Sequence, residues 1–414
     1  MDEQSRYAYG IDVGTENVRA VVLSLSKDGV GVVGYGEARN DGGMRKGVVT
    51  NLAVQKASVA RAIGQAENMS GKFFNTAMVS VNGSHLNSVK THGMVTIANG
   101  GAVTEDDIER LKDAAIKEAE ITGKLPQNRS ILSIVPISFT LDGQTGIQDP
   151  LGMQGVKLEM NACVVSGLGP SCASLTSVFE NEEVRVNVGK KIPTVEAAAR
   201  AVLTDKQVDN GVAMIDFGAA TTSVAIYDDG CLRYVGVVPE GSDNITKDLA
   251  IMLKIDSSIA EEIKIKYASA DFPEQPTDRD FEPITIRKGK ESATFTMDQV
   301  NQVVKGRLDE IFGLVMKEIA QARYVRKLPE GAVIVGGGAK LRGLAKYVRD
   351  ELELSVKIGM PGKDFIGTGV ADAIEKPEFA TAIGLALKMA DEGGTENQIE
   401  DDKPGFFARL FRRK

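Results

Sequence analysis

The chain carries the same strand-turn-strand signature twice, about half its length apart. In residues 9–25 (YGIDVGTENVRAVVLSL) and 212–230 (VAMIDFGAATTSVAIYDDG), an apolar run ends in Asp-x-Gly, passes a small polar turn and resumes as a second apolar strand. The copies share an aspartate and a glycine, which are Asp12 and Gly14 in the first and Asp216 and Gly218 in the second. This repetition predicts two related α/β domains whose hairpins face each other and hold a phosphate chain and its metal ion between them.

Each hairpin turn has what a nucleotide polyphosphate needs, namely backbone N–H donors, small residues that permit close approach, and an acid for a neutralising metal. We predict that Asp12 and Asp216 hold Mg²⁺, directly or through water. The predicted phosphate contacts are the backbone of both turns and the hydroxyls of the second: Gly14, Thr15, Glu16, Gly218, Ala219, Ala220, Thr221 and Thr222. A single Asp-x-Gly can equally be an ordinary hairpin turn, but two copies, each followed by an apolar strand, favour phosphate binding.

A third glycine element lies in the stretch AVIVGGGAKLRG. The apolar strand 333–335 is followed by Gly336, Gly337 and Gly338 and then by Lys340, ahead of a predicted helix. The backbone of such a loop can approach an adenine or a ribose, although loops of this kind also serve tight packing. The element matches neither the Walker A pattern nor GxGxxG, which argues against a P-loop or a Rossmann site.

Composition is typical of a globular protein and excludes several functional classes. The 414 residues leave room for two to four domains, and a net charge of -8 argues against a general nucleic-acid binder. Three cysteines without metal-ligand spacing suit a reducing cytosol. Of the two histidines, we expect His85 to be structural rather than catalytic. The N-terminus shows no signal peptide, and no apolar run approaches the roughly 20 residues that span a bilayer.

The C-terminus carries a separate signal. After an acidic polar stretch, the chain ends in PGFFARLFRRK. At about 100° per residue, the large apolar side chains of this segment fall within an arc of roughly 140° and the arginines lie opposite. The apolar set is Phe406, Phe407, Leu410 and Phe411, and the basic set is Arg409, Arg412 and Arg413. The pattern is typical of a basic amphipathic helix that lies in an anionic membrane surface. A core helix is the alternative, but no following domain would cover its phenylalanines.

The order of these features resembles the actin/Hsp70/sugar-kinase ATPase superfamily over most of the chain. That order is hairpin, alanine-rich helix, hairpin, VGGGAKLRG and a final EFATAIGLAL helix. Four phrases in matching order narrow the resemblance to the FtsA family of bacterial cell-division actin homologues: GSHLNSVKTHG, IQDPLGMQGVKLE, GSDNITKDLA and GFFARLFRRK. The resemblance implies a two-lobed actin-like α/β fold with duplicated mixed-sheet domains, ATP and Mg²⁺ as cofactors, ATP-dependent polymerisation, and tethering of the tubulin-like protein FtsZ to a membrane.

The resemblance also divides the chain. Residues 83–164 differ in composition from their surroundings and are predicted to form a compact α+β module inserted into the first domain, with Thr104 capping its helix. The expected boundaries are 1–82 with 165–204 and 379–390 for domain 1A, 83–164 for module 1C, 205–235 with 313–378 for domain 2A, 236–312 for domain 2B, 391–403 for a flexible acidic linker, and 404–414 for the amphipathic helix.

Some site residues follow from the resemblance alone. Glu261 and Lys264 fall where the superfamily contacts ribose and adenine, although by sequence they could equally be solvated helix charges. Lys247 is similarly ambiguous.

The resemblance also implies a residue that orients the attacking water. In the superfamily this is a polar residue on the helix before the second hairpin, where the family phrase is roughly EPLASAEAVLT. Here the segment reads PTVEAAARAVLT, so Thr194 and Val195 replace Glu-Pro, and Glu196 becomes the catalytic candidate. We therefore expect at most slow ATP hydrolysis, with the nucleotide acting mainly as a structural ligand.

The partners implied by the resemblance are the C-terminal peptide of FtsZ on the part of domain 2B around residues 236–312, further copies of the chain in filaments, other division proteins, and an anionic membrane surface. The expected location is the cytoplasmic face of the inner membrane at the division site. Two alternatives share the fold. A soluble metabolic kinase would have no need of the basic tail, and a pilus-assembly adaptor would bind an inner-membrane partner peptide. A chaperone would need a further β-rich peptide-binding domain.

Overall fold

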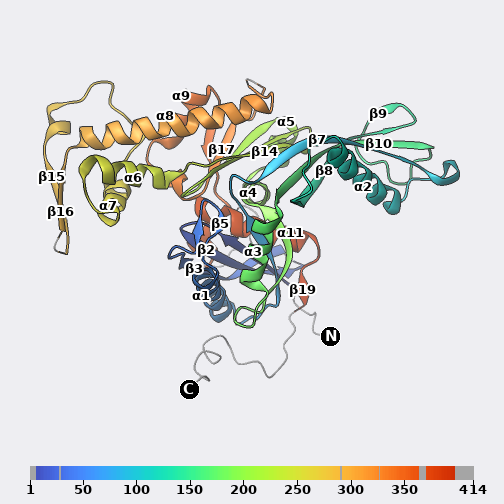
Figure 1. The fold of residues 1–414 in the computed structure, drawn as a ribbon, viewed down its shortest axis with the longest axis horizontal. Coiled ribbons are helices and arrows are strands. Elements are labelled where there is room, and N and C mark those ends of the chain that lie inside the picture. The colour runs from blue at the N-terminus through green and yellow to red at the C-terminus, as the bar shows by residue number, and fades with distance from the viewer. Residues whose placement is uncertain (1–5, 28, 290, 326, 363–369, 397–414) are drawn as a thin grey trace, which may run out of the picture.

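Two sheets with the same strand order form the centre of the molecule (Figure 1). The computed structural model describes residues 6–27, 29–289, 291–325, 327–362 and 370–396. The sheet orders are β11-β6-β1-β2-β3 and β18-β17-β12-β13-β14. In each sheet the middle strand pairs antiparallel with the second strand of its hairpin and parallel with the strand on its other side. The predicted duplication is therefore confirmed strand by strand.

The strands of the first sheet are β1 (Arg6–Val13), β2 (Asn17–Ser26), β3 (Gly29–Arg39), β6 (Thr76–Val81) and β11 (Asn187–Pro193). Those of the second are β12 (Val212–Phe217), β13 (Thr222–Asp228), β14 (Cys231–Val238), β17 (Ala332–Val335) and β18 (Val356–Ile358). A small hairpin, β4 (Met44–Arg45) with β5 (Val48–Val49), follows β3. The middle strands β1 and β12 are almost entirely buried, as expected for strands that are covered on both faces.

Helices of the first domain pack on its sheet and begin at clear signals. They are α1 (Leu52–Ser70), α3 (Gly169–Phe179), α4 (Thr194–Val202) and α11 (Ala380–Asp391). Asn51 caps α1, and Gly71 ends it in the left-handed conformation. Glycine is required where α11 crosses α4, because a Cβ on Gly384 would lie 1.7 Å from the carbonyl oxygen of Ala197.

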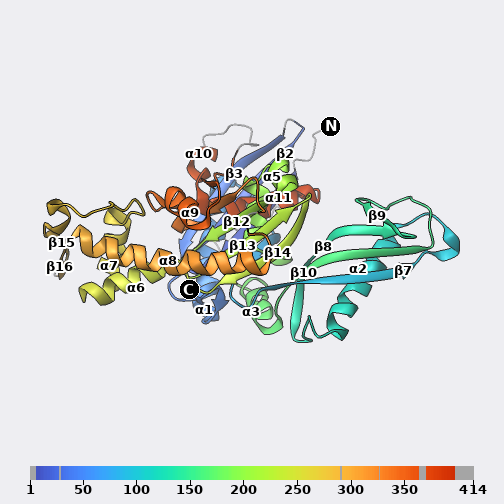
Figure 2. The same ribbon diagram turned by 90° about the horizontal axis from the view of Figure 1, so that it is seen from above.

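The inserted module lies at one end of the molecule (Figures 1 and 2). Its sheet has the order β7-β10-β8-β9, and α2 packs against β7 and β10. The bounds are β7 (Asn87–Thr96), η1 (Ala98–Gly100), α2 (Glu105–Ile121), β8 (Arg129–Leu141), β9 (Gln144–Ile147) and β10 (Lys157–Leu168). Thr104 and Asp107 form a capping box at the start of α2, as the sequence predicts.

The second lobe extends to the opposite end of the molecule (Figures 1 and 2). Its elements are α5 (Asp205–Asn210), α6 (Ser242–Leu253), α7 (Ser257–Tyr267), η2 (Asp278–Phe281), β15 (Ile284–Lys288), β16 (Glu291–Phe295), α8 (Met297–Gln321), η3 (Gly337–Lys340) and α9 (Leu344–Leu352). Thr296 caps α8, and the apolar stripe along this helix is buried.

The predicted linker over 391–403 does not begin where the sequence suggested. Asp391 still belongs to α11 and pairs with Arg200 at 2.9 Å, and β19 (Thr395–Glu396) pairs antiparallel with β1. Residues 391–396 are therefore held against the first domain by an ion pair and by strand pairing. The rest of the predicted linker and the predicted amphipathic helix 404–414 lie outside the described residues. Within the described ranges, no helix has the length and apolar character of a membrane-spanning segment.

Two short elements precede α11. These are α10 (Ala371–Ile374) and η4 (Pro377–Phe379). The backbone N–H of Gly336 donates to the Pro377 carbonyl at 3.0 Å, so η4 is attached to the glycine loop of the second sheet. The two lobes thus meet directly beside the ends of their central strands.

Candidate nucleotide site

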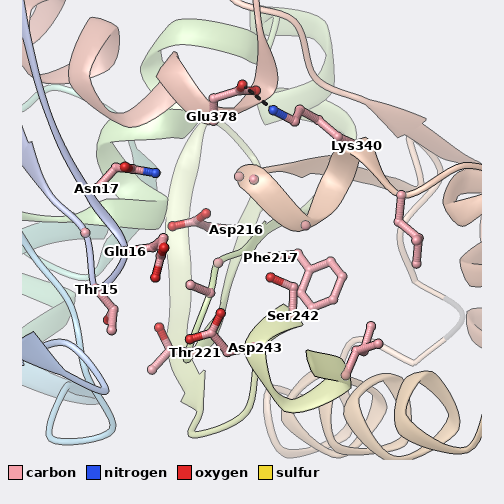
Figure 3. Close-up of a pocket in the computed structure, with 18 of the residues that line it drawn as sticks. Thr15, Glu16, Asn17, Asp216, Phe217, Thr221, Ser242, Asp243, Lys340 and Glu378 are labelled. Atoms are coloured by element: carbon pink, nitrogen blue, oxygen red, sulfur yellow. Dashed lines mark hydrogen bonds and ion pairs between the residues drawn. The ribbon is translucent and has the colours of Figure 1, made fainter. Parts of the chain in front are cut away.

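A cavity of about 560 Å³ lies between the lobes, at the ends of the two hairpins (Figure 3). It brings together most of the nucleotide-binding residues predicted from the sequence: Asp12, Gly14, Thr15, Glu16, Asp216, Gly218, Ala219, Thr221, Glu261, Lys264, Gly336, Gly337, Gly338 and Lys340. These residues come from both hairpin turns, from α7, and from the loop after β17 with η3. The volume and the mixture of backbone and charged groups suit a nucleotide-sized ligand.

The two hairpin turns have the same hydrogen-bond pattern. The N–H of Gly14 donates to the carbonyl of Asn17 at 3.0 Å, and the N–H of Gly218 donates to that of Thr221 at 3.0 Å. A Cβ on Gly14 would lie 2.7 Å from the same Asn17 oxygen, so the first turn needs glycine. Each turn therefore brings its backbone close to the cavity without an intervening side chain.

Asp12 and Asp216 are both buried at the cavity and lie in each other's electric field. Burial, and then the charge of Asp12, raise the pKa of Asp216 to about 7, against smaller lowering effects of Thr194 and Arg19. Burial also raises the pKa of Asp12, although Arg19 and a hydrogen bond from Ser80 Oγ at 2.8 Å oppose it. Two desolvated carboxylates that disfavour each other's ionisation are stabilised by a cation between them.

This pair fits Mg²⁺, which binds carboxylate oxygens and keeps several of its waters. Within the part of the chain that the structure describes, no group of three or more acidic, histidine or cysteine side chains gathers for a metal. The other ligands of an ion held by Asp12 and Asp216 would therefore be water and phosphate oxygens, which is the usual way that Mg²⁺ accompanies a nucleotide.

The side of the cavity next to α6 and α7 is lined by paired charges. Arg39 contacts Glu16 at 3.1 Å, and Lys264 contacts Glu261 at 2.6 Å. Burial raises the pKa of Glu16, and the charge of Arg39 opposes this. Asp243, at the start of α6, also has a raised pKa because of burial, and Lys264 lowers it. Figure 3 shows Glu16, Asp216 and Asp243 around the same space.

Three predicted residues lie outside the cavity lining. The hydroxyl of Thr222 donates to the Glu240 carbonyl at 2.8 Å and is buried beneath the turn. Lys247 is exposed on α6. The adjacent Ala220, also predicted to contact phosphate, is buried and does not line the cavity.

The predicted catalytic residue Glu196 points away from the cavity between the lobes, which is called the nucleotide cavity below after its predicted ligand. Its carboxylate pairs with Lys388 at 2.9 Å and accepts a hydrogen bond from Ser133 Oγ at 3.0 Å. It lines a different cavity, of about 680 Å³, beside α4 and α5. The reason is helical geometry, because side chains two positions apart on a helix point about 200° away from each other. Thr194 faces the nucleotide cavity, and Glu196 therefore faces the opposite way.

The sequence reasoning missed several lining residues. Arg19 on β2 stands opposite Asp12 in the hairpin register, which the spacing of the signature could have indicated. Asn82 follows β6, at the place where the glycine loop follows β17 in the second sheet. Its side chain donates to Thr221 Oγ1 at 2.9 Å and accepts from Ser223 Oγ at 3.0 Å, so it links the first lobe to the hairpin of the second.

One ion pair closes the cavity beside η3. Lys340 Nζ lies 2.8 Å from Glu378 Oε1, and the two residues come from η3 and η4 (Figure 3). Lys340 was predicted to contact nucleotide and does line the cavity, but here its ammonium group is held by Glu378. Glu378 opens the phrase EFATAIGLAL, which the sequence indicates only as a core helix, and its place in η4 beside the cavity emerges from the tertiary structure.

Comparison with known families and proteins gives a consistent result. The profile described as "Cell division protein FtsA" matches residues 213–384, and the profile "SHS2 domain inserted in FTSA" matches residues 83–166. Cell division protein FtsA of Pseudomonas aeruginosa is 32% identical over 397 residues, covering 93% of this chain and 89% of that protein. The protein of the same name from Neisseria meningitidis is 30% identical over 422 residues, covering 100% and 98%.

Solved structures with the same fold are more distant in sequence. The PilM–PilN type IV pilus biogenesis complex has a TM-score of 0.66 at 17% identity, covering 92% of this chain and 98% of that one. MreB5 of Spiroplasma citri bound to ADP has a TM-score of 0.50 at 14% identity, covering 95% and 100%. A second MreB5 structure, bound to AMPPNP, has a TM-score of 0.51 at 14% identity, covering 94% and 98%. These likenesses establish an actin-like fold.

Proposed function

This chain belongs to the FtsA family of actin-like cell division proteins, and we propose that it binds ATP with Mg²⁺ between its two lobes. The observation that carries the proposal is the pair of duplicated hairpins whose buried aspartates meet in one cavity. The fold relatives that hold ADP and AMPPNP support it. Asp12 and Asp216 would hold the ion, the turns at Gly14 and Gly218 would donate to the phosphates, and Mg²⁺ would neutralise their charge.

Calorimetric titration with ADP and AMPPNP tests this proposal. We expect binding that needs Mg²⁺, and we expect Asp216→Asn to weaken it by roughly tenfold or more, since a neutral amide is a poorer ligand for the cation. Asp278→Asn, in the exposed η2 helix, is a matched control that leaves affinity unchanged. The proposed site would be refuted if nucleotide affinity changed neither on removal of Mg²⁺ nor in the Asp216→Asn variant.

We further propose that ATP-bound molecules polymerise on a membrane and tether FtsZ to it, with slow ATP hydrolysis. The support is family membership together with the composition of the C-terminal segment. Full burial of its four large apolar side chains contributes at most about 6–12 kcal/mol. Ordering some ten residues costs about 1 kcal/mol each or more, and each cation near the surface adds about 1 kcal/mol. A single copy is therefore a weak, reversible anchor, and residence on the membrane depends on the avidity of a polymer.

Co-sedimentation with anionic liposomes tests the membrane anchor independently of the nucleotide site. Deletion of residues 404–414 is expected to abolish sedimentation with liposomes while nucleotide affinity stays intact. Neutral liposomes provide the control for the basic residues, because the electrostatic contribution to binding disappears on them. Unchanged sedimentation of the truncated protein would refute the membrane anchor without affecting the nucleotide site.

The partners and location remain part of the same proposal. The FtsZ C-terminal peptide is proposed to dock on domain 2B, around residues 236–312, and module 1C is proposed to contact other division proteins. The location is proposed to be the cytoplasmic face of the inner membrane at the division site. Fluorescence anisotropy with a labelled FtsZ C-terminal peptide tests the docking. The hairpin formed by β15 and β16 can be deleted to ask whether domain 2B carries the peptide.

A further inference from the structure

Three buried polar atoms that line the nucleotide cavity have no hydrogen-bond partner among the described residues. They are Nε of Arg19, Oγ1 of Thr194 and Oε2 of Glu378. Elsewhere in the described ranges, such atoms occur only on Gln55, which does not line this cavity. A buried polar atom without a partner costs about 1–3 kcal/mol, so three of them in one cavity point to a ligand of that cavity.

Two of the three atoms lie beside the paired aspartates. The Thr194 hydroxyl lies beside the Asp216 carboxyl group and lowers its pKa as a hydrogen-bonding neighbour, although no described residue meets full hydrogen-bond geometry with it. The charge of Arg19 lowers the pKa of both Asp12 and Asp216. Both residues thus line the cavity beside the aspartates at which the cation is proposed to bind.

The third atom is Oε2 of Glu378. The residues on either side of Glu378 place it near Asp216 and Arg19. The Pro377 carbonyl accepts the hydrogen bond from Gly336, and a Cβ on Gly336 would lie only 2.6 Å from Asp216 Oδ1. On the other side, the ring of Phe379 lies 5.3 Å from the guanidinium carbon of Arg19. The backbone of η4 therefore runs between Asp216 and Arg19.

The hydrogen-bond donor and acceptor properties of the three atoms indicate which ligand they can bind. Arg19 Nε is only a donor, the free oxygen of an ionised Glu378 is only an acceptor, and the Thr194 hydroxyl is both. A phosphate oxygen would be repelled by Glu378, and a cation would be repelled by Arg19. A water molecule both donates and accepts, so none of the three groups repels it, and buried waters typically make two to four such bonds.

We propose that Glu378, together with Thr194 and Arg19, holds the water that attacks the terminal phosphate of bound ATP. This inference rests on the proposed binding of ATP in this cavity. The water oxygen forms a bond to the terminal phosphorus, and the bond from that phosphorus to the bridging oxygen breaks. Inorganic phosphate and ADP result, and one proton of the water passes to Glu378 Oε2.

Glu378 is better placed for this role than the other glutamates near the cavity. Glu196 faces away from it, Glu16 pairs with Arg39, and Glu261 pairs with Lys264. Asp12 and Asp216 are the proposed cation ligands. Glu378 has one oxygen on Lys340, which fixes its orientation, and one oxygen left over.

The ion pair with Lys340 also ties this role to the arrangement of the lobes. Lys340 belongs to the second lobe, and Glu378 directly precedes α11 of the first. Glu378 lies in η4, where the chain passes from the second lobe to the first, so the water is held correctly only while this connection keeps its present arrangement. Such a requirement is consistent with slow turnover.

The isosteric variant Glu378→Gln tests the proposal, because it can still accept a bond from Lys340 but cannot take a proton. We expect its affinities for ADP and AMPPNP, measured by calorimetry, to stay within about twofold of the wild type. Its affinity for ADP with aluminium fluoride, which imitates the transition state, is expected to fall roughly tenfold or more, and ATP turnover on the order of 100-fold. Glu330→Gln, in a surface pair with Lys206, is the matched control and should leave all four unchanged.

Thr194→Val is a second variant, which replaces the hydroxyl by a methyl group of the same size. It is expected to bind ADP normally and to lose affinity for ADP with aluminium fluoride, and it decides the question if Glu378→Gln does not fold. Wild-type affinity of either folded variant for that analogue overturns the proposed water site. The proposed water site is also overturned if the wild-type protein binds ATP but never hydrolyses it. Failure of the wild type to bind ADP at all would instead overturn the proposed function.

Discussion

At the scale of single residues, the buried carboxylates define what the nucleotide cavity requires. Asp12 and Asp216 are each less than a tenth exposed, yet no described acidic, histidine or cysteine cluster completes a metal site around them. Their mutual repulsion in a poorly solvated place is unfavourable in the free protein and becomes favourable when a cation binds. In the proposed function, this repulsion lowers the stability of the nucleotide-free protein and favours cation binding, and it makes that stability dependent on pH.

Without nucleotide and Mg²⁺, stability is expected to fall as the pH rises from about 4 to about 7. The pKa of Asp216 is raised from 3.8 to about 7 in the folded protein, so in this interval the folded state binds more protons than the unfolded chain. The cost of ionising this group is absent below the unfolded pKa and complete above the folded one, on the order of 4 kcal/mol at most. Urea denaturation in EDTA from pH 5 to 8 should show that Asp216→Asn is stabilising, increasingly so at higher pH. Parallel pH profiles for the two proteins would contradict this.

Glu196 illustrates a buried charge with a structural role. Its side chain is 10% exposed and that of its partner Lys388 is 27% exposed. Glu196→Leu would leave the lysine partly buried and unpaired, and we expect a loss of about 2–3 kcal/mol in the free energy of unfolding. Nucleotide affinity should not change. The double variant Glu196→Leu with Lys388→Met should recover most of the stability. A loss of nucleotide affinity without a loss of stability would contradict this structural role and indicate that Glu196 acts at the nucleotide site.

At the scale of elements, the crossing of α4 and α11 positions one wall of the cavity. Both helices pack on β1 or its neighbours, and Thr194 begins α4 while Thr381 lies in the first turn of α11. Both threonines line the cavity. Close approach of the two helices requires a glycine, because a side chain at position 384 would collide with the backbone of Ala197.

Gly384→Ala is therefore expected to destabilise the protein by about 3 kcal/mol or more, since backbone atoms cannot move aside as a side chain can. The matched control is Gly306→Ala on α8, where a Cβ would meet nothing within 4 Å. That substitution should stabilise by up to about 1 kcal/mol through helix propensity. Chemical denaturation of both variants gives the comparison, and equal effects at the two positions would argue against the close crossing of α4 and α11.

At the scale of the whole molecule, the inserted module touches both lobes. Ser133 on β8 bonds Glu196 of the first lobe, and Ser88 on β7 bonds the second. The Ser88 hydroxyl donates to the Val235 carbonyl at 2.8 Å and accepts from the Val235 N–H at 2.8 Å. One side chain thus joins the edge strand of the module to β14, the edge strand of the second sheet.

Ser88→Ala should release this contact and cost about 1–2 kcal/mol, because two backbone groups lose their shared partner. The specific readout is hydrogen exchange, in which the Val235 amide should lose protection while the centre of β12 keeps it. Ser138→Ala, which removes a hydrogen bond made within the module to Asn161, is the control and should leave Val235 protected. Unchanged protection of Val235 in Ser88→Ala would show that the junction does not depend on Ser88.

Local sequence patterns were enough to determine the duplicated hairpins, the glycine loop after β17 and the capped helix α2, and the duplication predicted the meeting of Asp12 with Asp216 in one cavity. Each of these depends on residue spacing within one or two elements, which a linear chain displays directly. Only the tertiary structure decided that Thr194 rather than Glu196 faces the nucleotide cavity, that Glu378 joins it, and that residues 391–396 pack on the first domain. Those outcomes depend on the orientations and crossings of elements that lie far apart in the chain. A local sequence pattern carries no information about them.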